Sequence, residues 1–415
     1  MRPAIDVARH GFPVTEDLVH YMDTVTPNGD FLTDDSTWAI DFAPHGQRLK
    51  LGETITRKRY ADTLETIADE GPDAFYKGAI ANATIVALAK QGGIMTLKDL
   101  ADYQVAIREP AKITYRGYKI TACNAPSGGV VALSALNIAN GYPGFGDPER
   151  VNETTHLLDE AMRFAYAQRT ELGDPSFVPG MDKYTTGMLS DQAAAEARSK
   201  ISLTTTHNVS WYDPGGLESL DTPGTSHVVT ADASGLAISL TSTINLLFGS
   251  QLMVPETGVI MNDEMNDFSI PGSSNAFGFI PSPSNYIRPG KRPQSSISPA
   301  IVETPDGRLY FCIGAAGGSR IITSTIQNIH NVLDLGMTAA GALAQPRLHD
   351  QLVPSVVTFE YAYDNSTVAF MEGIGANVSW VAPGQSAAQG IRLLPNGTFE
   401  AAGEPRQKNS GGFAV

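Results

Sequence analysis

The sequence changes character at Gly224, and this change most constrains the fold. Residues 225–313 contain two pairs of β-branched and apolar segments, interrupted by glycine-containing turns at 232–235 and 304–307. Such a pattern predicts two β-hairpins. A third hairpin is predicted at residues 112–122, and the remaining periodicity before Gly224 is mainly helical. The chain is therefore expected to be a mixed α/β protein with a sheet-rich second half.

Helical spacing of apolar residues predicts helices at residues 54–71, 155–172 and 321–336. The side chains expected to face the core are Tyr60, Leu64, Ile67 and Ala68 in the first helix, Leu157, Leu158, Ala161, Met162, Ala165 and Tyr166 in the second, and Ile322, Ile326, Ile329 and Leu333 in the third.

Composition argues against some partners. The chain has 415 residues, a formal net charge of −15 and a pI of about 4.9. This negative charge makes nucleic acid and anionic membranes poor partners. No apolar run reaches the roughly 20 residues of a membrane-spanning helix, and the N-terminal segment lacks the apolar region of a signal peptide. The two cysteines, Cys123 and Cys312, either pair or remain as two buried free thiols.

Asn-X-Ser/Thr sites are more frequent than chance, which gives roughly two or three in such a chain. This excess favours a secretory route with glycosylated asparagines. The alternative is that the sites are unmodified surface loops. The six sites begin at Asn82, Asn152, Asn208, Asn365, Asn377 and Asn396.

Thr225-Ser226-His227 follows Gly224 at the start of a predicted strand, a position that suits a nucleophile. A threonine hydroxyl is a weak nucleophile and needs a base beside it. A cut between Gly224 and Thr225 provides one, because it frees the Thr225 α-amine; an ordinary α-amine has a pKa of about 8. The Thr225 hydroxyl can make this cut by attacking the Gly224 carbonyl, giving an ester that water hydrolyses. The alternative is an ordinary turn.

Three later segments carry groups that suit a substrate. Gly317-Gly318 precedes a predicted helix and offers N–H groups to an oxyanion, or equally to a phosphate. Glu264 and Asp267 form a carboxylate pair that can hold an ammonium; otherwise they cap a helix or lie in a solvated loop. Ser295-Ser296 can donate two hydrogen bonds to a carboxylate, or form a plain turn.

Five ordered blocks carry a family resemblance. They are Thr225-Ser226-His227; Thr243-Ile244-Asn245 with Phe248-Gly249; Glu264-Met265-Asn266-Asp267-Phe268-Ser269; Arg292-Pro293-Gln294-Ser295-Ser296-Ile297-Ser298-Pro299; and Gly317-Gly318-Ser319-Arg320. Together with "GFPVTEDL", "PSGG" and "DEAMRFAYAQR" in the first half, they make the sequence resemble the γ-glutamyltransferases, also called γ-glutamyltranspeptidases. The resemblance implies an N-terminal-nucleophile hydrolase with a four-layer αββα sandwich.

The resemblance also implies a role for each matching residue. Thr225 would be the nucleophile, with its own α-amine as base, and Thr243 would orient its hydroxyl. No metal or organic cofactor is implied. The other groups would bind substrate: Asn245, Glu264 and Asp267 the α-amino side of a glutamyl group, Ser295 and Ser296 its α-carboxylate, and Gly317 and Gly318 the oxyanion.

The implied substrates are glutathione and other γ-glutamyl compounds. A γ-glutamyl ester on Thr225 would pass to water, an amino acid or a dipeptide. Autocleavage would give a heterodimer in which residues 1–224 belong to the large subunit and residues 225–415 form the small subunit. Family members are secreted or membrane-associated, whereas this chain shows no signal or anchor segment.

One departure from the family pattern concerns the N-terminal side. Family members carry a long stretch before the part that resembles "RPAIDVARHGFPVTEDL", with an arginine that pairs with the substrate α-carboxylate. The sequence is therefore expected to be an N-terminally truncated member, and no arginine in it takes that role by motif.

Two other functions remain open. One is an inactive truncated fragment, which autocleavage would distinguish from an enzyme. The other is an acylase acting on glutaryl or cephalosporin side chains. Asn245, Glu264 and Asp267 argue against the acylase, because a glutaryl group has no α-amine for them to bind.

Overall fold

The computed structural model describes residues 1–27, 29–213, 215–217, 224–272 and 280–414. The chain forms two compact units. The first consists of residues 1–107 and 246–263, and the second of residues 108–245 and 264–415. Every residue with a predicted role in the site lies in the second unit.

The first unit is mainly helical and has an aromatic core. Trp38 is fully buried, and its ring centroid lies 5.0 Å from that of Phe31 and 5.8 Å from that of Phe248. The Trp38 indole N–H donates to the Gln251 carbonyl at 3.1 Å, so the segment 246–263 is anchored in this unit. The elements are α1 (Arg2–His10), α2 (Glu16–Val25), α3 (Phe31–Asp34), α4 (Ser36–Phe42), α5 (Lys58–Glu70), α6 (Asp73–Tyr76), α7 (Ala79–Lys90) and α8 (Leu97–Ala101), with the short paired strands β1 (Phe12–Pro13) and β2 (Thr54–Ile55).

Helix α5 confirms the first predicted helix but not its buried face. The helix ends at Gly71, as expected. Its buried residues are Ala61 and Thr63, whereas Tyr60, Leu64 and Ile67 are half-buried and Ala68 is exposed. The prediction was wrong because Thr63 is buried by a long-range contact: its hydroxyl donates to the Thr257 carbonyl at 2.9 Å.

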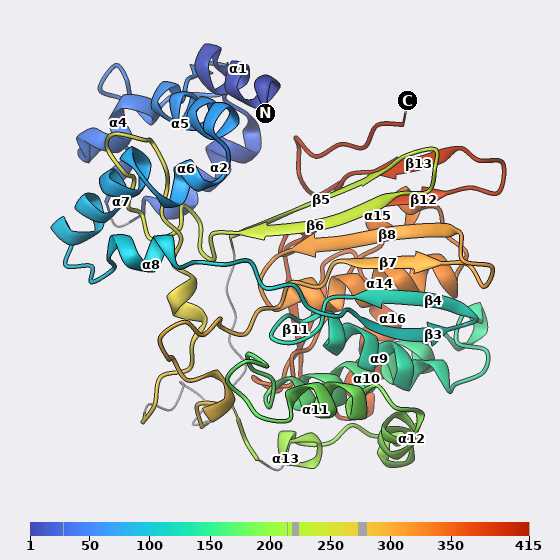
Figure 1. Ribbon diagram of the computed structural model, residues 1–415. Helices are drawn as coiled ribbons and strands as arrows, with labels where there is room; N and C mark the ends of the chain where they lie inside the picture. Colours follow the sequence, from blue (N-terminus) through green and yellow to red (C-terminus); the bar gives the residue numbers. More distant parts are fainter. Residues whose placement is uncertain (28, 214, 218–223, 273–279, 415) are drawn as a thin grey trace. The chain divides into compact units, whose positions relative to one another are not determined.

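The second unit is built on a six-stranded antiparallel sheet, with strand order β13-β12-β8-β7-β4-β3 (Figure 1). Both predicted hairpins that contribute to this sheet are confirmed: β3 with β4, and β7 with β8. The strands are β3 (Ala111–Tyr115), β4 (Tyr118–Ala122), β7 (Ala300–Glu303), β8 (Leu309–Ala316), β12 (Ala387–Leu393) and β13 (Phe399–Ala402).

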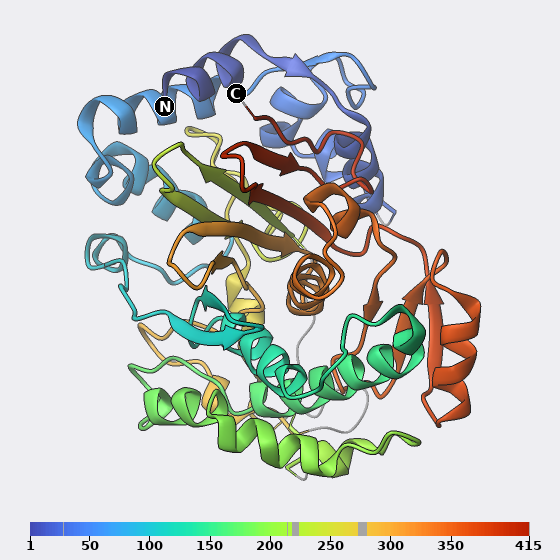
Figure 2. The same cartoon turned by 90° about the vertical axis from the view of Figure 1, so that its right-hand side faces the viewer.

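Helices cover one face of this sheet. Helix α9 (Gly129–Asn140) packs on β3 and β4, and α14 (Arg320–Leu333) packs on β8; α14 is seen nearly end-on in Figure 2. Helix α10 (Val151–Arg169) packs on α9. The apolar stripe predicted for α10 is fully buried, and of the four core residues predicted for α14 only Leu333 is not fully buried. These helices and the sheet form the main core of the unit.

The remaining predicted hairpin forms a separate layer. Strands β5 (Thr225–Ala231) and β6 (Ala237–Thr243) pair with each other and pack against β8 and β12. The buried His227 ring lies over Gly314, and Ser239 Oγ donates to the Ile313 carbonyl at 3.1 Å. The unit is therefore an α+β structure with a helix layer, a sheet and a second sheet layer, which correspond to three of the four layers of an αββα sandwich.

Smaller elements complete the second unit, which includes a three-stranded sheet of order β11-β10-β9. These elements are α11 (Met181–Met188), α12 (Asp191–Lys200), α13 (Val209–Tyr212), α15 (Ala339–Ala344), α16 (Asn365–Gly373), β9 (Leu348–His349), β10 (Val357–Glu360), β11 (Val378–Val381) and the 3₁₀ turns η1 (Pro148–Arg150), η2 (Glu264–Asp267) and η3 (Pro283–Asn285).

Both cysteines are free thiols. Cys312 is buried on β8, but Cys123 is only half-buried and its thiol donates to the Ile297 carbonyl at 3.2 Å. Burial raises the pKa of Cys123 to about 11, so it stays a thiol at neutral pH. Within the ranges that the structure describes, no helix is long and apolar enough to cross a membrane.

Candidate active site

Thr225 and Thr243 face each other where the β5–β6 hairpin begins and ends. They are a cross-strand pair, and Thr225 Oγ1 donates to Thr243 Oγ1 at 3.0 Å. Thr243 Oγ1 also accepts the Asn245 N–H at 2.9 Å and donates to the Gly224 carbonyl at 3.2 Å. The Thr243 hydroxyl is thus fixed by three contacts and holds the Thr225 hydroxyl in one orientation.

The Gly224 carbonyl lies in a polarising environment. Besides the Thr243 hydroxyl it accepts the Ile244 N–H at 3.3 Å. Two donors on one carbonyl oxygen favour attack at its carbon, because they stabilise the negative charge that develops there. Gly224 has φ 146°, in the region that favours glycine. This geometry suits an attack by the neighbouring Thr225 hydroxyl on the Gly224 carbonyl.

His227 does not act as the base for Thr225. Its ring is buried against Gly314, and its Nδ1 lies 2.8 Å from Thr241 Oγ1. Burial lowers the pKa of His227 to about 4, so the ring is neutral at pH 7. A Cβ on Gly314 would lie 2.3 Å from the ring, so the glycine makes room for it. His227 therefore fixes the hairpin on the sheet.

The contacts of the hairpin with β8 show where Thr225 lies along that strand. Ser239 contacts Ile313, and His227 lies over Gly314. Followed from Ser239 to His227, the hairpin therefore runs toward the end of β8 at Ala316. Thr225 is two positions beyond His227 on the same face of β5. It is consequently directed toward Gly317-Gly318, which directly follow β8.

The Gly317-Gly318 turn is closely packed and well supported. Gly317 has φ 128°, and a Cβ there would lie 2.5 Å from the Gln385 carbonyl oxygen, so only glycine fits. The turn leads into α14, whose N-terminus favours negative charge. Behind it the Tyr166 hydroxyl donates to the Ser319 carbonyl at 2.5 Å, and the Ser319 hydroxyl donates to Gln351. The turn is therefore held from α10 and suits an oxyanion.

Ser295 and Ser296 lie on the segment that leads into β7. The Ser295 N–H donates to the Pro126 carbonyl at 2.9 Å, and Ser296 Oγ accepts from Arg169 Nη2 at 2.9 Å. A Cβ on Gly128 would lie 2.9 Å from both the Ser296 carbonyl oxygen and Ile322 Cδ1. Ser296 therefore lies near the Ile322 side chain in the first turn of α14, the helix that follows Gly317-Gly318.

Asp267, one of the residues predicted to bind the α-amino group, is linked through Asn285 to the segment that carries Ser295 and Ser296. Asp267, which is 7% exposed, ends the 3₁₀ turn η2 that begins at Glu264. Asn285 Nδ2 donates to the Asp267 carbonyl at 2.7 Å, and Asn285 Oδ1 accepts the Gln294 N–H at 2.9 Å. Asn245 is buried and has φ 70°, a conformation that Asn tolerates.

The structure thus brings the predicted groups together in two connected sets. Hydrogen bonds join Thr225, Thr243 and Asn245, and the hairpin directs this set toward Gly317-Gly318. Ser296 and the residue after that turn, Ser319, both accept hydrogen bonds from α10, through Arg169 and Tyr166, and Asn285 ties Asp267 to the serine segment. Glu264 is half-buried, and we assign it to the site only because it lies in the same 3₁₀ turn, η2, as Asp267. Sequence reasoning missed the supporting roles of Tyr166, which was expected only in the core, and of Arg169, Asn285 and Gln294. All of these except Asn285 stand inside the quoted motifs.

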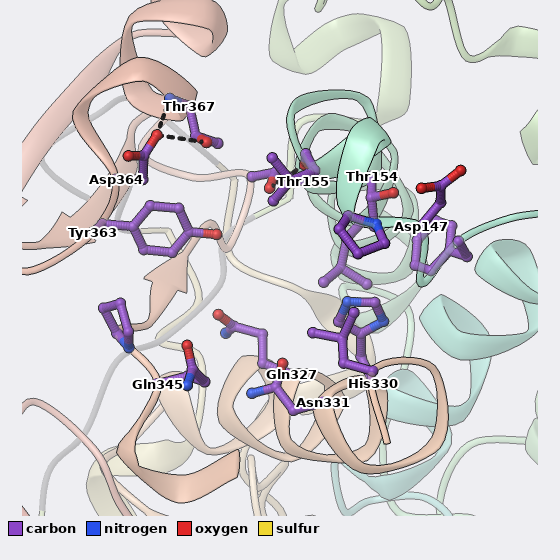
Figure 3. A pocket seen from close by; sticks show the side chains of 16 residues that line it. Asp147, Thr154, Thr155, Gln327, His330, Asn331, Gln345, Tyr363, Asp364 and Thr367 are labelled. Atoms are coloured by element: carbon purple, nitrogen blue, oxygen red, sulfur yellow. Dashed lines mark hydrogen bonds between the residues drawn. The ribbon is translucent and has the colours of Figure 1, made fainter. Parts of the chain in front are cut away.

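A separate cavity of about 210 Å³ lies among the helices of the second unit (Figure 3). Thr154 and Thr155 from α10 and Gln327, His330 and Asn331 from α14 line it. These residues come from the N-terminal half of α10 and the C-terminal half of α14, whereas the site contacts the other ends of both helices. At 1.5 Å per residue, His330 is about 15 Å along α14 from Arg320. The cavity is therefore distinct from the candidate site.

The comparison with known families agrees with the geometry. The gamma-glutamyltranspeptidase family matches residues 1–414. The chain belongs to this family. It is 55% identical over 415 residues to the glutathione hydrolase proenzyme of Arthroderma benhamiae. The matched region covers all of this chain and 71% of the relative. It is 49% identical to the glutathione hydrolase of Aspergillus flavus, again over the whole chain and 71% of the relative.

Solved structures support the fold of this family member. The cephalosporin acylase of Bacillus halodurans matches with a TM-score of 0.83 and 27% identity, over all of this chain and 73% of the acylase chain. The matching arrangement of helices and antiparallel sheets is the N-terminal-nucleophile hydrolase fold. The expected fold class is confirmed.

Proposed function

We propose that this gamma-glutamyltranspeptidase family member hydrolyses glutathione and other γ-glutamyl amides, after cutting itself between Gly224 and Thr225. The observation that carries this proposal is the hydrogen-bonded set of Thr225, Thr243 and the Gly224 carbonyl. The sequence relatives are glutathione hydrolases, and the name proenzyme fits a processed two-subunit form.

The first reaction is autocleavage. Thr225 Oγ1 attacks the Gly224 carbonyl carbon, the C–N bond to Thr225 breaks, and the Thr225 nitrogen takes a proton to become a free α-amine. The Gly224 ester formed on the hydroxyl is hydrolysed by water, which restores the hydroxyl. The Thr243 and Ile244 donors stabilise the oxyanion of this step.

The second reaction uses the new α-amine as base. The Thr225 hydroxyl, held by Thr243, attacks the γ-carbonyl of the substrate while the amine takes its proton. The amine then protonates the leaving amino group, and a γ-glutamyl ester remains on Thr225. Water releases glutamate, or an amino acid or dipeptide takes the γ-glutamyl group. The oxyanion lies at Gly317-Gly318, whose turn is held by Tyr166.

The substrate's glutamyl end sets the specificity. Asn245, Glu264 and Asp267 bind its α-ammonium, since two of them supply carboxylates. Ser295 and Ser296 donate to its α-carboxylate. We place the working enzyme on the secretory route, as an extracellular or membrane-associated protein. The sequons support this, because five of the six asparagines are exposed and Asn152 alone is half-buried.

The test compares γ-glutamyl-p-nitroanilide with glutaryl-p-nitroanilide, which differ only in the α-amino group. We expect the wild-type protein to hydrolyse the γ-glutamyl compound and the Thr225→Ala variant to hydrolyse neither. Preference for the glutaryl compound would overturn the proposal in favour of an acylase, the activity named for the Bacillus halodurans structure. Activity in Thr225→Ala would exclude Thr225 as the nucleophile.

A further inference from the structure

Arg169 lies directly behind the serine segment. It is the last residue of α10 and is 3% exposed. Its Nη2 donates to Ser296 Oγ at 2.9 Å, and its own carbonyl accepts Gln294 Nε2 at 2.6 Å. The side chain and the backbone of Arg169 therefore both hold the stretch that carries Ser295 and Ser296.

The chemistry of a guanidinium fixes the roles in this contact. Arginine is always protonated in proteins and only donates. Ser296 Oγ must be the acceptor, so the hydroxyl hydrogen of Ser296 points to another partner. A hydroxyl that accepts from a cation is also a better donor, because hydrogen bonds in a chain polarise one another. Such a hydroxyl suits an anionic acceptor.

We propose that Arg169 is a positioning residue of the α-carboxylate subsite, where it holds Ser296 as a donor and supplies a buried positive charge one hydrogen bond behind it. The inference rests on the proposed function, in which Ser296 binds the α-carboxylate. It names the ligand class that the subsite selects: γ-amides of an α-amino acid with a free α-carboxylate.

Ser298 offers a matched control two residues away. It is fully buried, and its hydroxyl lies 3.1 Å from Thr325 Oγ1 on α14 instead of an arginine. Ser298→Ala therefore removes a buried serine hydroxyl from the same segment without touching Arg169. If removing a serine hydroxyl merely loosened the segment, Ser298→Ala and Ser296→Ala would lose activity alike.

The experiment compares two substrates that differ only in the α-carboxylate, γ-glutamyl-p-nitroanilide and 4-aminobutyryl-p-nitroanilide. In processed Arg169→Met we expect KM for the first to rise about 10- to 100-fold, because a hydrogen bond to a charged group is weakened. The kcat for γ-glutamyl-p-nitroanilide and the kcat/KM for 4-aminobutyryl-p-nitroanilide should both stay near their wild-type values. Arg169→Lys, which keeps the charge and disturbs folding less, should show a smaller loss with the same selectivity.

Two further results test the mechanism. Adding Arg169→Lys to Ser296→Ala should cost nothing more than Ser296→Ala alone, since the arginine acts through this hydroxyl. L-glutamate should raise the Tm of the wild-type protein and of Ser298→Ala by similar amounts, and that of Arg169→Lys by less. Equal loss on both substrates, or an unchanged affinity for L-glutamate, would overturn the inference. A wild-type protein that hydrolyses only glutaryl-p-nitroanilide would instead overturn the proposed function.

Discussion

The contacts of Thr243 give it a part in both proposed reactions. Its hydroxyl contacts the Thr225 hydroxyl at 3.0 Å and the Gly224 carbonyl at 3.2 Å. In our proposal it therefore orients the nucleophile and polarises the bond to be cut. A threonine two positions earlier, Thr241, contacts His227 instead and provides a comparison within the same strand.

We predict that Thr243→Ala slows processing about 100- to 1000-fold, the usual cost of losing one oxyanion donor. The measurement is the fraction of cut chain against time, read by gel or mass. Thr241→Ala should process close to the wild-type rate, because its hydroxyl does not reach Gly224. Equal rates for the two variants would show that the Thr243 hydroxyl is not required.

His227 predicts a pH dependence of stability. Its folded pKa is about 4, below the usual 6.5, so the unfolded chain binds a proton more readily between these values. Stability is therefore lost as the pH falls from 6.5 toward 4, by about 2–3 kcal/mol at pH 4.5.

Urea unfolding at pH 7 and pH 4.5 measures this loss. The decrease should be smaller in His227→Gln, which has no imidazole to protonate, by about the same 2–3 kcal/mol. His20→Gln, at an exposed histidine, should keep the full wild-type decrease. An identical decrease in wild type and His227→Gln would mean that folding does not lower the pKa of this ring.

At the scale of elements, the β5–β6 hairpin has two unlike faces. Its inner face carries His227 and Ser239 against β8. On its outer face Val228, Ile238 and Leu240 are about half exposed, at 50%, 54% and 52%. Val228 and Leu240 are cross-strand partners, so the exposed side chains form a contiguous apolar row.

We expect this row to promote self-association, since contiguous exposed apolar surface on a sheet favours association with another apolar surface. The triple variant Val228→Thr, Ile238→Thr, Leu240→Thr should sediment as a smaller species than wild type at equal concentration. Its processing should be unchanged, because the inner face is untouched. Ile270→Thr, at an exposed residue outside the hairpin, should sediment as wild type does. A monomeric wild-type protein would contradict the expectation.

At the scale of the whole molecule, the predicted cut divides shared structure. Strands β3 and β4 precede Thr225 and the other four strands of the large sheet follow it, with β4 paired to β7. Buried contacts also cross the cut, among them Arg163 Nη1 to Asp350 at 2.6 Å. Two polypeptides that share one sheet and a buried ion pair should remain together after cleavage.

Intact mass and native gel filtration test this expectation together. Under denaturing conditions we predict two polypeptides, residues 1–224 and 225–415, and under native conditions a single elution peak that contains both. Thr225→Ala should give one uncut chain at the same native position. Separation of the two polypeptides without denaturant would show that the sheet does not hold them.

Local patterns were sufficient for much of this fold. The hairpin at residues 225–243, the pair β7–β8 and the stripe on α10 follow from alternation and helical spacing, which depend on near neighbours alone. The face of α5 did not follow, because the contact of Thr63 with Thr257 spans 194 residues and leaves no periodic signal.

The sequence by itself determined the family and the candidate reacting groups. A glycine, a threonine and a strand in succession allow the prediction of a self-cleaving nucleophile, because that chemistry needs only adjacent residues. Tertiary structure alone decided how these groups are supported. Arg169 meets Ser296 across 127 positions, Tyr166 meets Ser319 across 153, and Asn285 joins Asp267 to Gln294. Such pairs form only when separate helices and loops pack together, and no spacing along the chain encodes the distance between them.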